Sequence, residues 1–316
     1  MKVFVAGATG AVGSALVPVL VEAGHEVVGM TRSEGKADSL RAAGAEAAVA
    51  DALDREAVVA AVRDAQPEVV VHELTALPSK FDTRKFDRTF EQTNRLRTEG
   101  TDNLLGAARA AGARRFVAQS FAGWPYAPTG GPVKAEADPL DPDPPKAMRA
   151  TLDSIRRLES TVLGADDIEG IVLRYGGFYG PGTGVAVMLD EIRKRRFPIV
   201  GDGGGVWSFV HTDDAARATL AAIERGRPGI YNVVDDEPAP VSEWLPYLAE
   251  TIGAKPPWRV PAFVGRLAAG EAGLSLMTRS RGASNAKAKR ELGWEPRYRS
   301  WRQGFKEGLG AYAGPS

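Results

Sequence analysis

The stretch Lys2-Val3-Phe4-Val5-Ala6-Gly7-Ala8-Thr9-Gly10-Ala11-Val12-Gly13 decides the fold. An apolar run typical of a buried strand leads into a glycine-rich turn, and a stretch of helical period follows. Gly7 permits a tight turn, Gly10 lets the backbone approach a pyrophosphate, and Gly13 lets helix and strand pack closely. Three glycines alone also fit an ordinary turn, but strand, turn and helix in this order favour a phosphate-binding loop.

The first two-thirds of the chain repeats this alternation of short β-branched runs and longer Ala/Leu/Arg-rich stretches. Strands are expected at 2–6, 26–31, 46–50, 69–72, 115–119 and 170–175. Helices are expected at 12–23, with a kink at Pro18, and at 55–64, 97–111 and 150–163. The pattern predicts βαβ units, hence an α/β fold with a parallel sheet.

Composition excludes several classes of function. The 316 residues carry 40 Lys plus Arg against 40 Asp plus Glu, which leaves no basic footprint for nucleic acid or an anionic membrane. The absence of cysteine excludes disulfides, thiolate metal sites and cysteine nucleophiles, and three scattered histidines disfavour a metal cluster. No apolar run is long enough for a signal peptide or a membrane span. We expect a soluble, cytoplasmic protein with a small-molecule substrate and no metal.

The second predicted strand ends in Gly29-Met30-Thr31-Arg32-Ser33, where binders of NAD carry an acidic residue for the ribose 2′-hydroxyl. Arg32, with Ser33 as a further donor, suits a 2′-phosphate, so we expect NADP(H) rather than NAD(H); a solvated surface arginine is the alternative. Asp51 and Ala52 follow the third strand. The Asp51 carboxylate is placed to accept from an adenine amino group, or to cap the following helix.

Later motifs extend the pattern to nearly the whole chain. They are Val70-Val71-His72-Glu73-Leu74-Thr75-Ala76, Thr93-Asn94 with Gly100-Thr101-Asp102-Asn103-Leu104-Leu105, Leu173-Arg174-Tyr175-Gly176-Gly177-Phe178-Tyr179-Gly180-Pro181-Gly182, Phe209-Val210-His211-Thr212-Asp213-Asp214-Ala215-Ala216-Arg217-Ala218, and Lys287-Ala288-Lys289-Arg290-Glu291-Leu292-Gly293-Trp294. In this order they resemble the extended branch of the short-chain dehydrogenase/reductase superfamily, whose members include NAD-dependent epimerases and dehydratases.

The resemblance implies a Rossmann-type, doubly wound parallel sheet with a smaller C-terminal substrate-binding lobe. The expected division is a cofactor domain at 1–175, to which 206–234 returns, and a lobe made of 176–205 and 235–316. The proline-rich loop 124–145 is expected to be a lid or pocket wall. The helices at 97–111 and 150–163 are where members of this family often pair, so a homodimer is expected.

The expected cofactor site combines the glycine loop with positions that the resemblance implies. Asn94 is included, although it could instead bond its own backbone at a helix start. The residues expected to bind the cofactor are Gly7, Thr9, Gly10, Ala11, Val12, Gly13, Arg32, Ser33, Asp51, Ala52, Leu74, Thr75, Ala76, Asn94, Gln119, Tyr175, Gly177 and Phe178.

The catalytic positions depart from the family. Its enzymes use a Tyr and a Lys four residues later on one helical face, where the ammonium lowers the phenol pKa and the phenol exchanges a proton with substrate. Here Thr151 and Ile155 occupy these positions, and no tyrosine in the chain is followed four residues later by lysine. Ser120, Tyr126, Thr151 or a bound water are the candidates for proton delivery. Glu73 is a further candidate for a tuned acid or base.

The expected substrate site is largely apolar. Phe121 aligns with the family's catalytic serine, and Gly177 and Trp207 replace the Asn and Arg that hold phosphates in enzymes acting on nucleotide sugars. Loss of a phosphate-binding guanidinium and gain of an indole favour an apolar or aromatic substrate. Phe121, Trp124 and Trp207 are the candidate substrate-binding residues, although packing in the core is an alternative for each.

These features predict an NADP(H)-dependent oxidoreductase acting on a small, fairly apolar carbonyl, alcohol or activated alkene without the usual Tyr/Lys relay. An epimerase or dehydratase with tightly held nucleotide is one alternative. A nonenzymatic NADP(H)-sensing or partner-binding protein is the other, because fold alone does not settle function.

Overall fold

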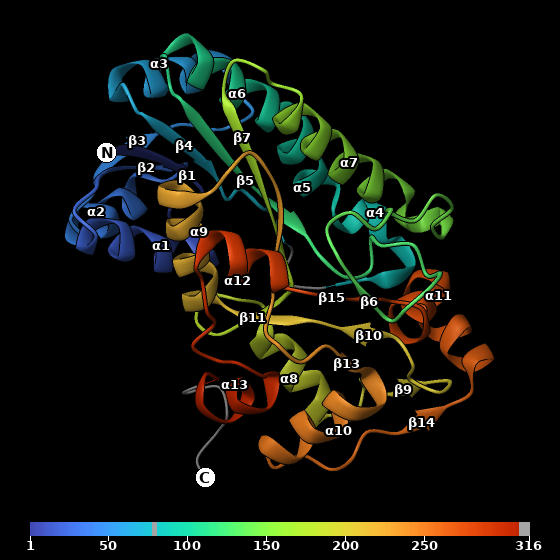
Figure 1. The fold of residues 1–316 in the computed structure, drawn as a ribbon. Coiled ribbons are helices and arrows are strands. Elements are labelled where there is room, and N and C mark those ends of the chain that lie inside the picture. Colours follow the sequence, from blue (N-terminus) through green and yellow to red (C-terminus); the bar gives the residue numbers. More distant parts are fainter. Residues whose placement is uncertain (78–80, 310–316) are drawn as a thin grey trace.

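The structure is a computed structural model that describes residues 1–77 and 81–309. A seven-stranded parallel sheet in the order β12-β7-β5-β4-β1-β2-β3 forms its centre (Figure 1). The strands of this sheet are β1 (Lys2–Ala6), β2 (Glu26–Thr31), β3 (Glu46–Val49), β4 (Val69–His72), β5 (Arg115–Phe121), β7 (Glu169–Tyr175) and β12 (Gly229–Val233). The predicted Rossmann-type α/β fold is confirmed.

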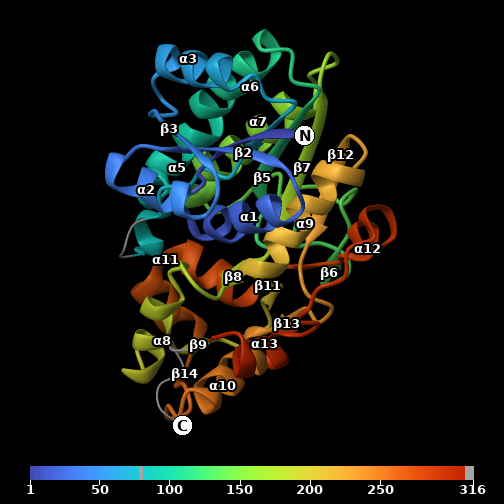
Figure 2. The ribbon, with the colours of Figure 1, turned by 90° about the vertical axis from the view of Figure 1, so that its left-hand side faces the viewer.

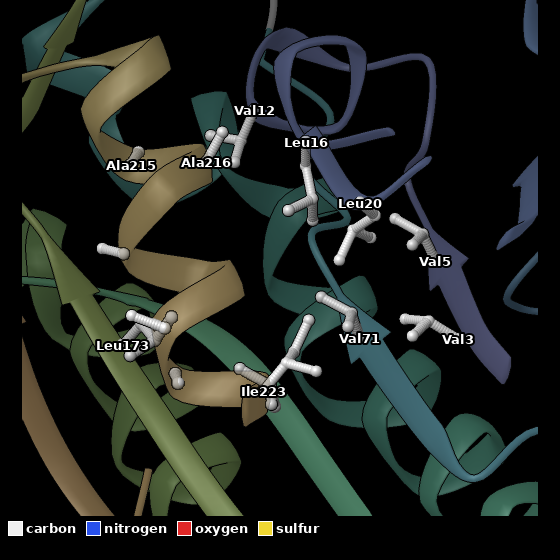
Figure 3. Close-up of a cluster of buried hydrophobic side chains, with 14 of the residues drawn as sticks. Val3, Val5, Val12, Leu16, Leu20, Val71, Leu173, Ala215, Ala216 and Ile223 are labelled. Carbon is white, nitrogen blue, oxygen red and sulfur yellow. The ribbon is translucent and has the colours of Figure 1, made fainter. Parts of the chain in front are cut away.

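Helices cover both faces of the sheet, and each face has its own apolar core (Figure 1). On one face lie α1 (Ala11–Glu22), α2 (Glu34–Ala42) and α9 (Thr212–Arg225); on the other lie α3 (Arg55–Ala65), α4 (Phe86–Thr89), α5 (Glu91–Arg95), α6 (Thr101–Ala110) and α7 (Arg149–Leu163). Figure 3 shows how Leu16 and Leu20 of α1 meet Val71 of β4 and Ile223 of α9 in the first core. The near-continuous apolar strands are those of a sheet buried on both faces.

A second layer of structure lies beyond the carboxyl ends of the sheet strands, as Figures 1 and 2 show. Its helices are α8 (Val185–Arg193), α10 (Val241–Thr251), α11 (Ala262–Thr278) and α13 (Trp301–Glu307), while α12 (Ala286–Leu292) packs on α9 and β12. Four two-stranded ladders join them: β8 (Gly177–Tyr179) with β11 (Phe209–His211), β9 (Ile199–Val200) with β14 (Arg259–Val260), β10 (Val206–Trp207) with β13 (Ala239–Pro240), and β6 (Val133–Lys134) with β15 (Gly282–Ala283).

The predicted strands agree with those of the structure to within two residues, but several helices differ. α2 was not predicted, because it is a short helix with only two buried residues. The predicted kink at Pro18 does not interrupt α1. The helix expected at 97–111 begins earlier, because α5 runs through a π-helical turn at Leu96–Gly100 into α6. Within the described residues, no helix is long and apolar enough to cross a membrane.

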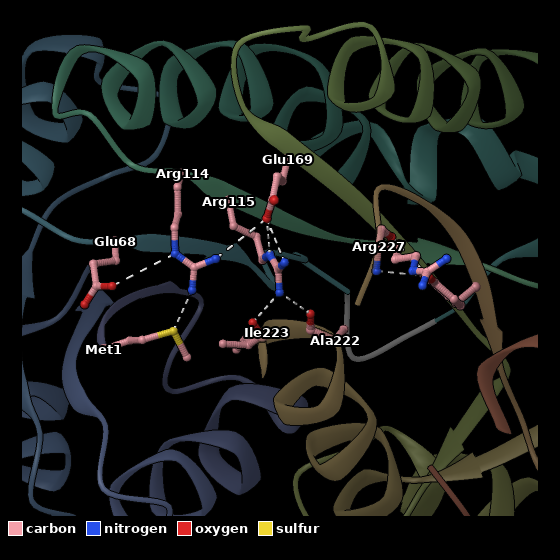
Figure 4. A network of polar contacts seen from close by, with 9 residues as sticks. Met1, Glu68, Arg114, Arg115, Glu169, Ala222, Ile223 and Arg227 are labelled. Carbon is pink, nitrogen blue, oxygen red and sulfur yellow. Dashed lines mark hydrogen bonds and ion pairs between the residues drawn. The ribbon is translucent and has the colours of Figure 1, made fainter. Parts of the chain in front are cut away.

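A buried arginine ties the start of β5 to the end of α9 (Figure 4). The Arg115 guanidinium donates to Oε2 of Glu169 from Nε at 2.9 Å and from Nη2 at 2.7 Å. Its Nη1 donates to the carbonyl of Ala222 at 2.9 Å and to that of Ile223. These carbonyls belong to the last turn of α9, where a cation is favoured by the helix dipole.

Replacing this arginine tests its contribution. Arg115→Leu is expected to lower the free energy of unfolding by about 2–3 kcal/mol, because buried helix-end carbonyls lose their donor. The neighbouring Arg114 is half exposed and pairs only loosely with Glu68 and Glu169. Arg114→Leu should therefore change stability by less than about 1 kcal/mol. Equal losses in urea denaturation of the two variants would contradict this assignment.

Candidate functional site

The glycine loop is built around two backbone contacts that no side chain would allow. Gly7 has φ +89°, and a Cβ there would lie 2.7 Å from the carbonyl oxygen of Glu73. A Cβ on Gly13 would lie 2.2 Å from the carbonyl oxygen of Gly7. Gly10 precedes α1 and caps it with no side chain, so the helix presents its first N–H groups. This end of α1 fits a diphosphate.

A second glycine segment closes over this helix end. Gly182, in the loop after β8, has φ +76°, and a Cβ there would lie 3.3 Å from Cα of Ala11 and 3.9 Å from Oγ of Ser14. Only a residue without a side chain lets the loop approach α1 so closely. The sequence motif contained Gly182, but only the structure brings it to the phosphate loop.

Positive charge gathers beyond the end of β2. Arg32 lines a cavity of about 440 Å³ together with Ala76, Leu77, Arg88, Thr89, Glu91, Gln92 and Arg95. Arg95 is paired with Glu99, so Arg32 and Arg88 against Glu91 leave an excess of positive charge and N–H donors that suit a phosphate group. Arg88 and Arg95 come from α4 and α5, more than fifty residues after Arg32, so no local sequence pattern could have pointed to them.

The other residues expected around the adenosine make hydrogen bonds to neighbouring groups of the protein. The Asp51 carboxylate accepts from the backbone N–H of Leu53 at 3.0 Å, and the Asn103 amide donates to the carbonyl of Ala52 at 3.0 Å. The hydroxyls of Thr9 and Thr31 lie 3.4 Å apart. Asp51 thus makes a turn ahead of α3 while remaining exposed.

The start of α7 holds Thr151, the residue predicted to stand in place of the family's tyrosine. Thr151 is buried, and its hydroxyl donates to Oδ1 of Asp87 at 2.7 Å while accepting from the Asn94 amide at 3.1 Å. Asp87 also accepts from the backbone N–H groups of Ala150 and Thr151. The Thr151 proton is therefore engaged by Asp87, which the sequence analysis did not single out. Ile155, at the lysine position, lies in the core.

Ser120 and Tyr126 meet in one buried network. The Ser120 hydroxyl donates to Oε1 of Glu159 at 2.7 Å, and Arg174 binds both oxygens of that carboxylate at 2.7 and 2.6 Å. The Tyr126 hydroxyl donates to Oδ1 of Asn232 at 2.7 Å and accepts from Nη1 of Arg174 at 3.0 Å. Both predicted proton donors thus have partners within the protein, contributed by α7, β7 and β12.

Burial shifts the pKa values of the two ionisable residues at the end of β4, His72 and Glu73. Burial lowers the pKa of His72 to about 4, and its ring bonds the carbonyl of Leu96 and the backbone N–H of Leu74. Glu73 points to the opposite face, where the Tyr175 hydroxyl donates to its Oε1 at 3.1 Å. Burial raises the pKa of Glu73 to about 8, and its Oε2 has no partner in the described chain. Both groups are therefore uncharged at neutral pH.

Two of the aromatic residues predicted to bind substrate, Trp124 and Trp207, lie in separate clusters that both contact Leu276 of α11. Trp124 packs against Phe86 at 5.3 Å between ring centres, in a cluster that includes Leu276 of α11. Trp207 lies 5.0 Å from Trp244 in the core of the second lobe and donates its indole N–H to the carbonyl of Leu276. Phe121 lies at the end of β5 and is partly exposed.

The remaining predicted cofactor residues follow the ends of the sheet strands. Ala76 donates its backbone N–H to the Thr93 hydroxyl at 3.1 Å, which fixes the segment of Leu74 and Thr75 beside α5. Phe178 packs 5.2 Å from Tyr175 between ring centres. Gln119 ends up in β5, and Gly177 lies in β8 opposite Phe209. Their roles toward a cofactor stay predictions.

Comparison with known proteins agrees with this geometry. Residues 3–233 match the NAD dependent epimerase/dehydratase family. The chain belongs to that family. Two reductases are similar: the 3-diazoavenalumate denitrifying reductase of a Streptomyces species (47% identity, 96% of this chain, 99% of the relative) and the 2-alkyl-3-oxoalkanoate reductase of Stenotrophomonas maltophilia (31%, 80% and 76%).

Solved structures of the extended short-chain dehydrogenase/reductase class share the fold. A human epimerase family protein, solved with NADPH, has a TM-score of 0.77 at 21% identity and covers 98% of this chain and 99% of its own. The family and its reductase-type relatives make the chain an NAD(P)-dependent oxidoreductase with a nicotinamide cofactor. The glycine loop, with its uncapped helix end, fits that cofactor.

The raised pKa of Glu73 has a consequence for stability. The folded state holds this proton up to about pH 8, whereas an unfolded glutamate releases it near its ordinary value. The contribution of Glu73 to the free energy of unfolding is fully present below the ordinary pKa of a glutamate. It falls by about 1.4 kcal/mol for each unit that the pH rises from there toward 8. Glu73→Gln should abolish this loss, so the variant should exceed the original protein in stability at pH 8 by a few kcal/mol.

Urea denaturation at pH 5, 6.5 and 8 measures this difference. Glu26→Gln, at an exposed glutamate at the start of β2, is the matched control and should follow the original protein. A parallel pH dependence of Glu73→Gln and the original protein would show that Glu73 is ionised in the folded state.

Proposed function

We propose that the protein is an NADPH-dependent reductase of a small, fairly apolar, electrophilic acid, and that its reaction takes no proton from the helix that carries the family's Tyr/Lys pair. The favoured substrate is a diazo compound that loses its nitrogen as N₂. The observation that supports this most is the state of Thr151, whose proton is held by Asp87, together with the apolar Ile155 in place of a lysine.

Whether the reaction needs a proton donor depends on the chemical group that accepts the hydride. A carbonyl that receives hydride becomes an alkoxide, and a general acid that protonates it contributes about 10²–10⁴-fold in rate. A diazonium ion needs no such acid, because the incoming hydride itself neutralises the positive charge. The C–N bond breaks, N₂ leaves with its electron pair, and a C–H bond replaces it, so no proton is required. Bound NADPH supplies the hydride, and the protein orients the substrate and excludes water.

The relatives support this choice of substrate. The name of the 47% identical relative describes removal of nitrogen from a diazo compound by a reductase, and that relative matches the chain over nearly its whole length. The 31% identical relative reduces an oxoalkanoate, which makes a ketone or other carbonyl the second candidate. Both names describe carboxylate anions, so we propose that the substrate is an acid in either case.

We further propose NADPH rather than NADH as the reductant. Arg32, Arg88 and Arg95 line the cavity beyond β2, and a 2′-phosphate is the group by which the two cofactors differ there. A guanidinium binds phosphate through charge-assisted paired hydrogen bonds, whereas the 2′-hydroxyl of NADH gains little from a cluster of cations.

Single arginine replacements test the cofactor preference. Arg32→Ala and Arg88→Ala should each weaken NADPH binding about tenfold or more, because one charge-assisted contact is lost. NADH binding should change less than about twofold. Arg63→Ala on the exposed side of α3 is the control and should alter neither. Equal losses for both cofactors in fluorescence titrations would overturn the assignment.

A matched pair of substrates tests the reaction. The diazonium ion made from 4-aminocinnamate should consume NADPH and release one N₂ per NADPH, above the rate with heat-denatured protein. 4-Formylcinnamate has the same acid and the same unsaturated body but needs a proton at its oxygen. Its reduction should be slower by about 100-fold or more.

The outcomes separate the candidate functions. Equal or faster reduction of the aldehyde would favour a carbonyl reductase that uses water as its acid. Bound nucleotide that is not consumed with either compound would favour an epimerase or dehydratase. Reversible NADPH binding with no turnover of either compound would favour a sensing protein.

A further inference from the structure

Arg97 lies on the π-helical turn Leu96–Gly100 that joins α5 to α6. Side chains hold this turn in place: the His72 ring bonds the carbonyl of Leu96 at 3.2 Å, and the buried Thr101 hydroxyl donates to that of Arg97 at 2.7 Å. The Thr98 hydroxyl donates to the carbonyl of Asn94 at 3.0 Å. A π turn inserted in an α-helix is rare and frequently lies at a functional site.

The guanidinium of Arg97 has few partners inside the protein. It donates from Nη1 to Oδ1 of Asn94 at 3.3 Å, which is the one side-chain hydrogen bond that it makes within the described chain. A guanidinium carries five N–H donors in a planar fork. Glu159 is the acid that faces it, but Ser120 and Arg174 already bind both oxygens of that carboxylate.

The charges around Arg97 do not balance. Arg174 and Glu159 neutralise each other, and His72, which faces Arg97 from β4, is uncharged. Thr151 and Ser154 of α7 are neutral hydroxyl groups that bond Asn94. Burial lowers the pKa of Arg97 to about 10, which leaves it protonated at neutral pH. The Asp87 carboxylate is bonded to Thr151 and to two backbone N–H groups rather than to Arg97. Within the described residues no carboxylate pairs with Arg97 directly, and burying its charge is costly unless an anion binds.

Arg97 keeps part of its surface area exposed, although protein atoms surround its guanidinium densely enough to lower its pKa. The phosphates of the cofactor have other sites, at the start of α1 and among Arg32, Arg88 and Arg95. Arg95 turns to that cavity and to Glu99, whereas Arg97 faces α7 and the end of β4. The substrate is the remaining source of negative charge.

We propose that Arg97 binds the carboxylate of the substrate through its guanidinium and so fixes the orientation of an acid beside α7. The inference rests on the proposed function, which takes the substrate to be an acid. A planar guanidinium matches a carboxylate with two parallel hydrogen bonds, and partial burial strengthens the pair relative to one in water. Arg97 is then the residue that selects acids over neutral compounds of the same shape.

Binding of an unreactive pair of probes tests the assignment. Cinnamate and the uncharged cinnamamide have nearly the same shape, and their dissociation constants are measured by calorimetry with protein saturated with NADP⁺. The original protein should bind cinnamate at least about tenfold more tightly than cinnamamide, as expected for one charge-assisted contact. Arg97→Gln should remove this preference while leaving the affinity for cinnamamide within about twofold.

Two further variants make the result specific. Arg157→Gln removes an exposed arginine of α7 that pairs with Asp102, and it should keep the preference for cinnamate. Arg97→Lys retains the charge but not the planar fork, so it should show an intermediate preference. Thermal unfolding of each variant checks that it is folded.

The outcomes are distinct from those of the reductase assay. Equal affinity of the original protein for cinnamate and cinnamamide would overturn the role of Arg97, even if Arg97→Gln proved unfolded. An undiminished preference in a folded Arg97→Gln protein would overturn it as well. Failure of the diazonium assay with a preference that depends on Arg97 would reject the proposed reaction and keep the carboxylate site.

Discussion

The close contact between the glycine loop and the end of β4 is the constraint on which the rest of the site depends. A side chain at Gly7 or Gly13 would overlap backbone oxygens, so only this sequence lets α1 begin directly beside the carboxyl end of β1. The same contact fixes the backbone of Glu73. From there the chain runs past the face of α5 and into the segment that lines the arginine cavity. This one packing contact therefore helps to place the glycine loop, the segment after β4 and the arginine cavity relative to one another.

At the carboxyl ends of the strands, the ionisable side chains on the two faces of the sheet are in different states. On the face of α1 and α9, the carboxyl group of Glu73 is held neutral by burial, so it does not repel the phosphates of a dinucleotide at α1. On the face of α7, Glu159 is paired with Arg174, and Arg97 bonds the Asn94 amide and no carboxylate within the described residues. Thr151 and Ile155, the residues predicted at the positions of the family's Tyr/Lys pair, are bonded to Asp87 and buried in the core, respectively.

The sequence predicted the parts of this arrangement that depend on local pattern. The sheet strands and the turn between β1 and α1 follow from short-range periodicity and glycine spacing, and the structure has them at the expected residues. What could not be predicted depends on partners far along the chain. Whether Thr151 can give up its proton depends on Asp87, and the π turn that presents Arg97 leaves no mark in hydrophobic periodicity.

The positive charge of Arg97 would favour one orientation of the proposed substrate over the other. An acid that carries a diazonium group has opposite charges at its two ends, so Arg97 attracts one end and repels the other. At 4 Å each interaction is about 1 kcal/mol in water and about 4 kcal/mol near a partly buried site. The wrong orientation is therefore penalised twice. The proposed reaction uses no proton relay, so in it the protein's main contribution to the rate would be to hold the acceptor in line with the hydride.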